Sequence, residues 1–401
     1  MKDFKVKFIM GPPECNDPNI PDYSKQFIEE FSNVANLNIT YGDIEEIAEQ
    51  SLTVFFIGSG GAEISFNENY QKVKEPYILL TTPAYNSLPS AMEIMGFLQE
   101  HNLKGEILHG DMKQMADRLN VLLKVADAKA KLSKQILGCF GQPGGLIASN
   151  ADIKALNDKY GIKLQVFTLD ELIDEYKKGG YPENEYTKKL LDKSFNNDET
   201  IKALNVYGAL KRLISKYNLT AVSVRCFDLL NTIQTTGCLA LAILNAEGIP
   251  AACEGDQKTL LSMVISYLLT GQSSFMANPS CMDTKANEII YAHCTIPMDM
   301  VDDYKLMTHF ESNIGVAISC DIEPQKMTIF KCNGDLSNYH AEMAELLETM
   351  HRTNLCRSQM RLHLPNGCDY FCKNPISNHH LIIKGDYTSL FDEFFSQLKT
   401  I

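Results

Sequence analysis

Short apolar segments alternate with amphipathic stretches along the first two thirds of the chain, and this alternation limits the possible folds more than any other feature. Residues 5–10, 53–57 and 77–81 have the pattern of buried strands, and residues 23–34 have the pattern of an amphipathic helix. Strands that alternate with helices form a parallel sheet with helices on both faces. We therefore predict a Rossmann-like, doubly wound α/β domain over residues 1–125.

The same alternation continues after a long helical stretch and predicts a second domain of this kind over residues 126–286. After residue 287 the pattern changes to short strand-like segments separated by turns such as Asn333-Gly334, with one helical stretch at 340–351. We predict a small β-rich, barrel-like domain over residues 287–401. The expected fold class is α/β, with two doubly wound domains followed by this smaller domain.

The charge and apolar content of the chain exclude several classes of protein. The formal net charge is −13, whereas nucleic-acid binding depends on basic surfaces. The chain contains no apolar stretch close to the roughly 18 residues of a membrane span, and its first residues are too charged for a signal peptide. We expect a cytoplasmic protein with no nucleic-acid or membrane partner. The 12 cysteines contain no CxxC pair and suit free thiols in a reducing compartment.

Polar side chains follow two neighbouring strands of the predicted second domain. Arg225, Asp228 and Asn231 come after one strand, and Glu254 and Asp256 come after the next. Ligands of open α/β sheets bind beyond the carboxyl ends of the strands, so these groups predict a polar site there. Two structural alternatives remain open: Asp256 caps the following helix, and Arg225 forms an ion pair with Asp228.

Histidines are the second group of candidate site residues. His379 and His380 precede a predicted strand, and His293 ends another. Adjacent residues of a strand point to opposite faces, so only one of His379 and His380 faces a given site. For His293, a hydrogen-bonded core position is the alternative to a contact with a ligand.

A series of motifs over roughly residues 220–385 resembles the compact members of the fucose/arabinose isomerase superfamily. The motifs occur in one order along the chain: CEGD, LLSM, YLLTG, FMANPS, AHCTIP, THFES, LCRSQ and SNHHLIIKGD. The first 220 residues share only the α/β alternation. The resemblance implies an aldose–ketose isomerase that acts on a free sugar, with the possibility of a deoxy or sulfo sugar.

The resemblance also implies a divalent metal, typically manganese, held by two carboxylates and a histidine. Glu254 falls at the first carboxylate of the family and His379 at the histidine. The second carboxylate of the family lies 24 residues after the first, where this chain has Asn278. An amide oxygen can still bind a hard cation, but it brings no charge. We keep Asn278 as a predicted ligand, and Asp228 or a water is an alternative.

Isomerisation of a sugar moves a proton between C1 and C2 through a cis-enediol, which requires charge stabilisation on oxygen and a base. We predict Glu254 as metal ligand and acid/base and Asp228 as a second base. The predicted substrate-binding residues are Arg225, Asn231, Asn278, His293 and His380, and His380 is also placed to orient His379. By resemblance the chain forms a homo-oligomer, as a hexamer or a trimer of dimers.

Two other functions use the same residues. A sugar-binding or regulatory protein on the same scaffold needs no metal, so metal analysis separates it from an isomerase. A metal-dependent epimerase or lyase also works through an enediol, and product analysis in heavy water distinguishes it.

Overall fold

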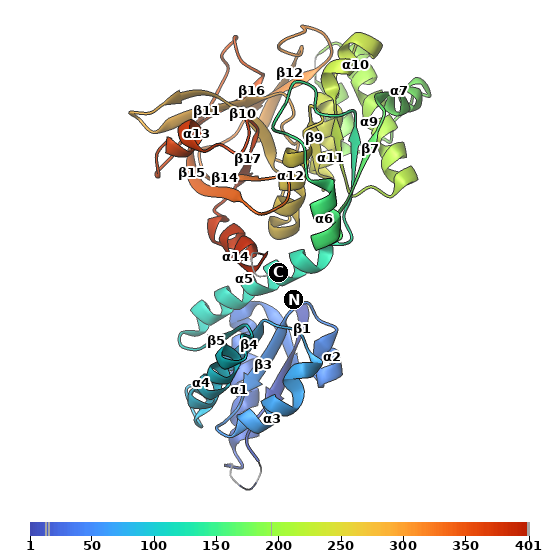
Figure 1. The fold of residues 1–401 in the computed structure, drawn as a ribbon. Helices are drawn as coiled ribbons and strands as arrows, with labels where there is room; N and C mark the ends of the chain where they lie inside the picture. Colours follow the sequence, from blue (N-terminus) through green and yellow to red (C-terminus); the bar gives the residue numbers. More distant parts are fainter. Residues whose placement is uncertain (13, 15–16, 194, 399–401) are drawn as a thin grey trace. The chain divides into compact units, whose positions relative to one another are not determined.

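The computed structural model describes residues 1–401 except 13, 15–16, 194 and 399–401. The chain divides into two compact units, Met1–Ala130 and Lys131–Ile401. Figure 1 follows the chain through both. Within the described residues, no helix combines the length and the apolar character that crossing a membrane requires.

Unit 1 is a five-stranded parallel sheet with the strand order β2-β1-β3-β4-β5. The strands are β1 (Lys2–Ile9), β2 (Leu37–Tyr41), β3 (Thr53–Ile57), β4 (Tyr77–Thr81) and β5 (Gly105–Leu108). The helices are α1 (Ile20–Ala35), α2 (Ile44–Ala48), α3 (Ala62–Asn69), α4 (Ser87–Glu100), the short η2 (Tyr70–Lys72) and α5 (Met112–Leu132), whose last residues belong to unit 2.

The sheet of unit 1 is buried on both faces, as its sequence pattern predicts. Every residue of β3 and β4 is buried. One face packs against Phe31 of α1 and Leu119 of α5, and the other packs against Phe66 of α3 and Ile94 of α4. Continuous apolar strands covered by helices on both faces are typical of a doubly wound sheet.

Unit 2 begins with a four-stranded parallel sheet in the order β7-β6-β8-β9. The strands are β6 (Ile136–Phe140), β7 (Lys163–Phe167), β8 (Ala221–Val224) and β9 (Ala251–Cys253). The helices of this part are α6 (Ile153–Tyr160), α7 (Leu169–Lys177), α8 (Glu185–Asp192), α9 (Asn197–Tyr217), α10 (Cys226–Ile233), α11 (Cys238–Ala246) and α12 (Gln257–Thr270).

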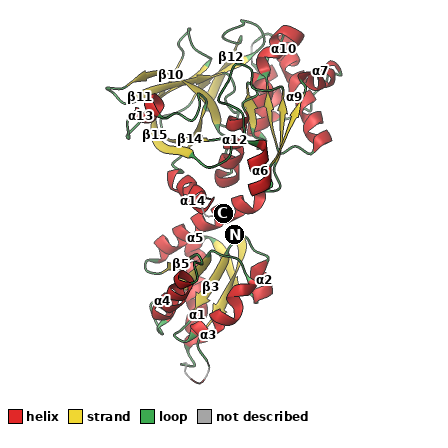
Figure 2. Cartoon of the chain, in the orientation of Figure 1, coloured by secondary structure: helices red, strands yellow, loops and turns green. Residues whose placement is uncertain are grey.

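The rest of unit 2 is built on a closed antiparallel barrel with the strand order β10-β11-β16-β15-β14-β17 (Figure 2). Its strands are β10 (Phe275–Asp283), β11 (Glu288–His293), β14 (Lys326–Cys332), β15 (Tyr339–Met350), β16 (Ser358–His363) and β17 (His380–Lys384). The remaining elements are the pair β12 (Asp303–Met307) and β13 (Ala317–Asp321), and the helices α13 (Asp369–Lys373) and α14 (Thr388–Leu398).

Helix α12 connects the two halves of unit 2. It follows β9 of the parallel sheet and packs against β8 and β9 as well as against β14 and β17 of the barrel. Most of its side chains are buried because it is covered on several sides. The turn between β9 and α12 therefore lies at the junction of the parallel sheet and the barrel.

The predicted fold class is confirmed, with parallel sheets, helices and a closed barrel in the expected order. The predicted helix at 340–351 is wrong, because β15 (Tyr339–Met350) pairs with β14 and β16 there. The division into domains at 1–125, 126–286 and 287–401 stays a prediction. Strand β10, which precedes residue 287, is a barrel strand.

Candidate metal centre

The Cys253-Glu254-Gly255-Asp256 turn reverses the chain abruptly between β9 and α12. Glu254 and Gly255 both have a left-handed backbone, with φ of 60° and 68°. A side chain on Gly255 would lie 3.1 Å from the backbone of Gln142, so any other residue at this position is strained. Asp256 then caps α12 by accepting a hydrogen bond from the Thr259 amide at 2.7 Å. The turn directs the Glu254 side chain away from the helix that Asp256 starts.

Two histidines of the barrel meet the Glu254 carboxylate. His293 ends β11, and His379 directly precedes β17; β10 lies between these two strands. Glu254 Oε1 lies 3.3 Å from His293 Nε2 and 3.5 Å from His379 Nε2. One ligand atom from each of the three residues lies within 4.8 Å of the others. A carboxylate of the parallel sheet and two imidazoles of the barrel thus converge within unit 2.

The donor atoms of this cluster fit a divalent cation. The Nδ1 atoms are engaged elsewhere: His379 Nδ1 with Asp256 Oδ2 at 2.9 Å, and His293 Nδ1 with the Thr295 hydroxyl at 3.0 Å. His379 Nε2 is buried and has no hydrogen-bond partner among the described residues. A buried, unpaired nitrogen is costly in a protein interior, and coordination of a metal satisfies it. One oxygen and two imidazole nitrogens suit manganese, iron, cobalt or zinc.

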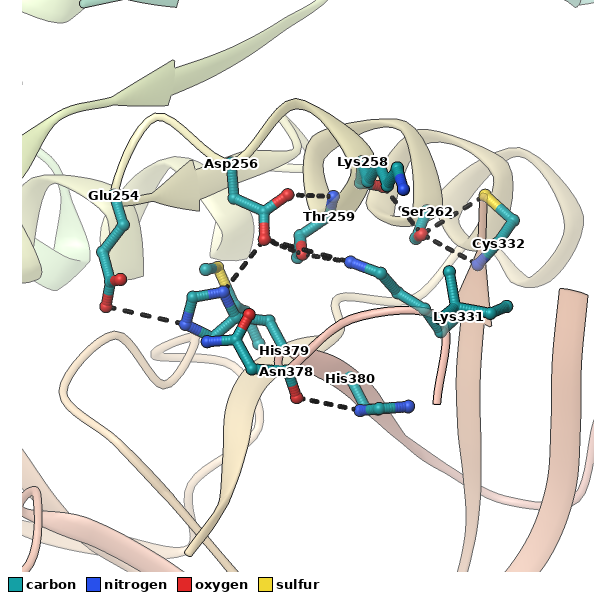
Figure 3. Close-up of polar contacts among 12 residues, drawn as sticks. Glu254, Asp256, Lys258, Thr259, Ser262, Lys331, Cys332, Asn378, His379 and His380 are labelled. Carbon is teal, nitrogen blue, oxygen red and sulfur yellow. Dashed lines mark hydrogen bonds and ion pairs between the residues drawn. The ribbon is translucent and has the colours of Figure 1, made fainter. Parts of the chain in front are cut away.

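Figure 3 shows Asp256 and Lys331, the charged groups on the Nδ1 side of His379. Asp256 is fully buried and holds three contacts: His379 Nδ1 at 2.9 Å, the Thr259 amide at 2.7 Å and the Thr259 hydroxyl at 2.7 Å. The ammonium of Lys331, also fully buried, lies 3.9 Å from Asp256 Oδ2 and 2.5 Å from Thr259 Oγ1. A carboxylate that holds the outer nitrogen of a metal-binding histidine is the usual support of such a ligand.

The surroundings of the two carboxylates keep them ionised. Burial alone would raise the pKa of Glu254, but the adjacent imidazoles of His293 and His379 hold it well below its usual range. Burial opposes the ionised form of Asp256 as well, and the Lys331 charge and the His379 hydrogen bond lower its pKa. The pKa of His379 is raised, because these carboxylates outweigh the effect of its burial. Both carboxylates are therefore anionic at neutral pH and able to neutralise a bound cation.

Asn278 lies on β10, the strand between those that carry the two histidines. It pairs with Ala292 in the β10–β11 ladder, and its side-chain oxygen accepts a hydrogen bond from Asn378 Nδ2 at 3.1 Å. The backbone pairing thus places Asn278 opposite Ala292, the residue before His293 on β11. Its predicted role as a metal ligand stays a prediction.

Arg225 and Asp228 form the ion pair that the sequence left open. Arg225 Nε lies 2.9 Å from Asp228 Oδ2, and both side chains are partly exposed. Arg225 directly follows β8, the strand beside β9, while Asp228 and the exposed Asn231 lie on α10. The ion pair is compatible with a role in binding, and the catalytic role of Asp228 stays a prediction, as do the binding roles of Arg225 and Asn231.

His380 is held apart from the cluster by the alternation of β17. Its ring nitrogens contact the Tyr370 hydroxyl at 2.9 Å and the Asn378 carbonyl at 3.0 Å. Burial and the nearby Lys331 charge lower the pKa of His380 to about 3, so its ring is neutral. The residue that hydrogen-bonds the outer nitrogen of His379 is Asp256, and a role of His380 in binding stays a prediction.

The sequence pattern alone did not indicate that His293 and Lys331 belong to this network. His293 was predicted to line the substrate pocket, and this role stays a prediction; the structure brings its Nε2 to Glu254 beside His379. The available signal was its place at the end of a strand that pairs with the FMANPS segment. For Lys331 the signal was a lysine within the apolar segment 327–332, where a charge requires a buried partner.

No protein-family model matches the chain. The chain is 25% identical over 219 residues to a sulfoquinovose isomerase of Alkalicoccus urumqiensis. The aligned region covers 52% of this chain and 49% of that protein. It is 28% identical over 187 residues to a sulfoquinovose isomerase of Clostridium sp. (strain MSTE9). This second aligned region covers 44% of this chain and 41% of that protein. The resemblance to the fucose/arabinose isomerase superfamily is confirmed. The chain matches about half the length of the relative from Alkalicoccus and a smaller part of the length of the relative from Clostridium.

Proposed function

We propose that this chain is a metal-dependent aldose–ketose isomerase that acts on a sulfonated monosaccharide. The convergence of Glu254, His293 and His379, with the unpaired Nε2 of His379 facing the carboxylate, is the observation that carries the proposal. The two relatives named sulfoquinovose isomerase support the reaction and the class of sugar.

The proposed ligands are Glu254, His293 and His379, with the Asn278 side-chain oxygen as a further donor. The cation is Mn²⁺ in this proposal, because a mixed oxygen and imidazole site suits it and the resembling family typically uses it. When bound there, a divalent cation supplies Lewis acidity toward two neighbouring oxygens of the sugar.

The net reaction transfers one hydrogen from C2 to C1 and another from O2 to O1. The Glu254 carboxylate is ionised and 18% exposed, so it can accept a proton from a sugar that enters the site. Asp228 is the proposed second base, and its partial exposure lets it exchange protons with solvent. If Asp228→Asn retains full turnover, this second role is wrong.

Arg225 is the proposed partner of the sulfonate group. It lies at the carboxyl end of β8, on the same edge of the parallel sheet as Glu254 after β9. Its Nε faces Asp228, and a side chain on Gly144 would lie 3.4 Å from its guanidinium, so the 141–145 loop packs against it. A planar guanidinium is well suited to binding an oxyanion. Asn231 and His380 complete the proposed list of binding residues.

The assembly and location of the protein belong to the same proposal. We expect a homo-oligomer, in line with the resemblance. Every cysteine that the structure describes is a free thiol, which suits the cytoplasm that we propose.

A panel of aldoses assayed with Mn²⁺ tests the proposal. The panel includes a 6-sulfo, a 6-deoxy and an unmodified hexose, and we expect ketose formation with the 6-sulfo sugar to be the fastest. Glu254→Gln should reduce turnover at least about 100-fold, because it removes the charge of a ligand and removes the base. Glu342→Gln is the matched control, since Glu342 is also buried beside a histidine in unit 2, and it should stay active. Absence of ketose from every sugar with metal-loaded protein would contradict the proposal.

A further inference from the structure

Lys331 is a fully buried lysine that the proposed reaction does not use. It lies on β14 between Phe330 and Cys332, which are also fully buried. Lysine is almost never completely buried unless its ammonium is paired, because the charge loses its hydration. Figure 3 shows its side chain reaching from the barrel toward the first turn of α12.

The register between β14 and α12 holds this lysine in place. Ser262 of α12 accepts a hydrogen bond from the Cys332 amide at 3.1 Å, and its hydroxyl lies 3.2 Å from Cys332 Sγ. These contacts are one residue away from Lys331 on the strand. The ammonium is thereby aimed at Thr259, one helical turn before Ser262.

Each hydrogen bond between Lys331 and His379 has a fixed donor, and the bonds from both ends converge on Asp256. An ammonium only donates, so Thr259 Oγ1 accepts from Lys331 and its own hydrogen goes to Asp256 Oδ2. A carboxylate only accepts, so the hydrogen between Asp256 and His379 belongs to Nδ1 of the imidazole. In the neutral ring, Nε2 is then left with a lone pair, and this nitrogen faces Glu254.

We propose that Lys331 is a positioning residue that acts through Thr259 and Asp256 to keep the lone pair of His379 on Nε2, where a divalent cation binds. The inference rests on the proposed metal centre and deepens it. Without the Lys331 ammonium, no donor from β14 occupies the Thr259 oxygen, so the Thr259 hydroxyl can turn its hydrogen away from Asp256 Oδ2. Asp256 then holds the Nδ1 hydrogen of His379 less firmly, so the ring can carry its hydrogen on Nε2 instead, which blocks coordination.

Two variants interrupt this series of hydrogen bonds at different points. Lys331→Met keeps the length of the side chain and removes the charge, and Thr259→Val keeps the shape and removes the hydroxyl. Thr259→Ser restores the hydroxyl and serves as the rescue. Thr328→Val is the matched control, because Thr328 is a fully buried, hydrogen-bonded threonine on β14 whose hydroxyl donates to the Gly385 carbonyl instead.

The first measurement is the affinity of the metal-free protein for Mn²⁺ by isothermal titration calorimetry. We expect Lys331→Met to weaken binding about 10- to 100-fold, the effect of losing a partner that orients a ligand. Thr259→Val should weaken it roughly 3- to 10-fold, the effect of one lost hydrogen bond. Thr259→Ser and Thr328→Val should bind like the unaltered protein.

The second measurement is the imidazole ¹⁵N spectrum of metal-free protein at a pH where the His379 ring is neutral. The unaltered protein should carry the His379 hydrogen on Nδ1, and the two interrupting variants should show a population with the hydrogen on Nε2. A purely structural lysine would lower the melting temperature without moving this hydrogen. If Lys331→Met fails to fold, the Thr259→Val and Thr259→Ser pair gives the answer by both measurements.

The outcomes separate the inference from the proposed function. If the unaltered protein binds Mn²⁺ and isomerises the sugar while the folded variants bind Mn²⁺ equally well and keep the hydrogen on Nδ1, the role of Lys331 is wrong and the proposed function stands. If the unaltered protein binds no divalent cation, the proposed function is wrong and the inference fails with it.

Discussion

Glu254 combines a strained backbone with a chemically important side chain. Its φ of 60° lies in a region that residues other than glycine adopt at a cost of roughly 1–3 kcal/mol. The neighbouring Gly255 and the Asp256 helix cap fix this conformation. Strain that the surrounding structure maintains is typical of functional positions, and here it aims the carboxylate at His293 and His379.

His293, which was predicted to bind the substrate, lies beside His379 at the Glu254 carboxylate, so it provides a direct test of the proposed ligand set. We expect His293→Gln to reduce Mn²⁺ affinity by more than about 10-fold, because even the loss of a residue that orients a ligand has that effect. Calorimetric titration measures it. His309→Gln is the control, as His309 is a buried histidine of unit 2 that hydrogen-bonds Ser312. If His293→Gln binds Mn²⁺ as tightly as the unaltered protein, His293 is not a metal ligand and only its predicted role in binding the sugar remains.

The sequence was informative about single residues where a motif carried them. CEGD and SNHH led to Glu254 and His379, which the structure brings to 3.5 Å of each other. The sequence could not assign His293 to this cluster, because a histidine at the end of a strand points to either face until the register of β10 and β11 is known. The partner of His379 was also missed, since Asp256 acts both as a helix cap and as a support for the imidazole.

Among the elements, β15 shows how tertiary pairing overrides local preference. Its sequence is rich in Ala, Glu, Leu and Met, which favour helices, and a helix was predicted there. The structure pairs it with β14 and β16, and the buried positions alternate as Glu342, Ala344 and Leu346. A buried glutamate in the apolar set hid the alternation of a strand from the sequence pattern. The βα alternation was easier to predict because its strands are continuous apolar segments.

Helix α14 packs against β15 of the barrel and stacks an aromatic side chain on β14. Phe391 stacks on Phe330 with ring centroids 3.9 Å apart, and both side chains are fully buried. We expect Phe391→Ala to lower the free energy of unfolding by about 3–5 kcal/mol, the range for loss of a buried aromatic ring. Urea denaturation followed by circular dichroism measures this change. Met307→Ala, at a side chain that is 38% exposed, should change it by less than about 0.5 kcal/mol. A small effect of Phe391→Ala would mean that α14 contributes little to the barrel.

At the scale of the whole molecule, the proposed metal ligands come from two parts of unit 2 that are distant in sequence. Glu254 follows the parallel sheet, and His293 and His379 belong to the barrel. The unfolded chain does not hold these atoms together, so binding of a cation is coupled to the folding of unit 2. The order of the two parallel sheets and the barrel could be predicted from the sequence. The approach of His293 and His379 could not, because it depends on pairing between strands that are distant in sequence.

Removal of the metal should therefore destabilise the protein. A cation present at 100 times its dissociation constant adds about 2.7 kcal/mol to the free energy of unfolding. We expect Mn²⁺ to raise the melting temperature of chelator-treated protein by roughly 5 °C, as scanning calorimetry would record. Glu254→Gln should show little of this response. An equal response of both proteins would mean that the cation binds elsewhere.

The most direct test of the account follows the conversion of a 6-sulfo aldose in heavy water by ¹H and ¹³C NMR. The account predicts a ketose with an unbroken carbon chain and solvent deuterium at C1 or C2, formed only by Mn²⁺-loaded protein with Glu254 and His379 intact. Fragments of shorter carbon chains, a C2 epimer without ketose, or equal turnover by the metal-free protein would contradict it.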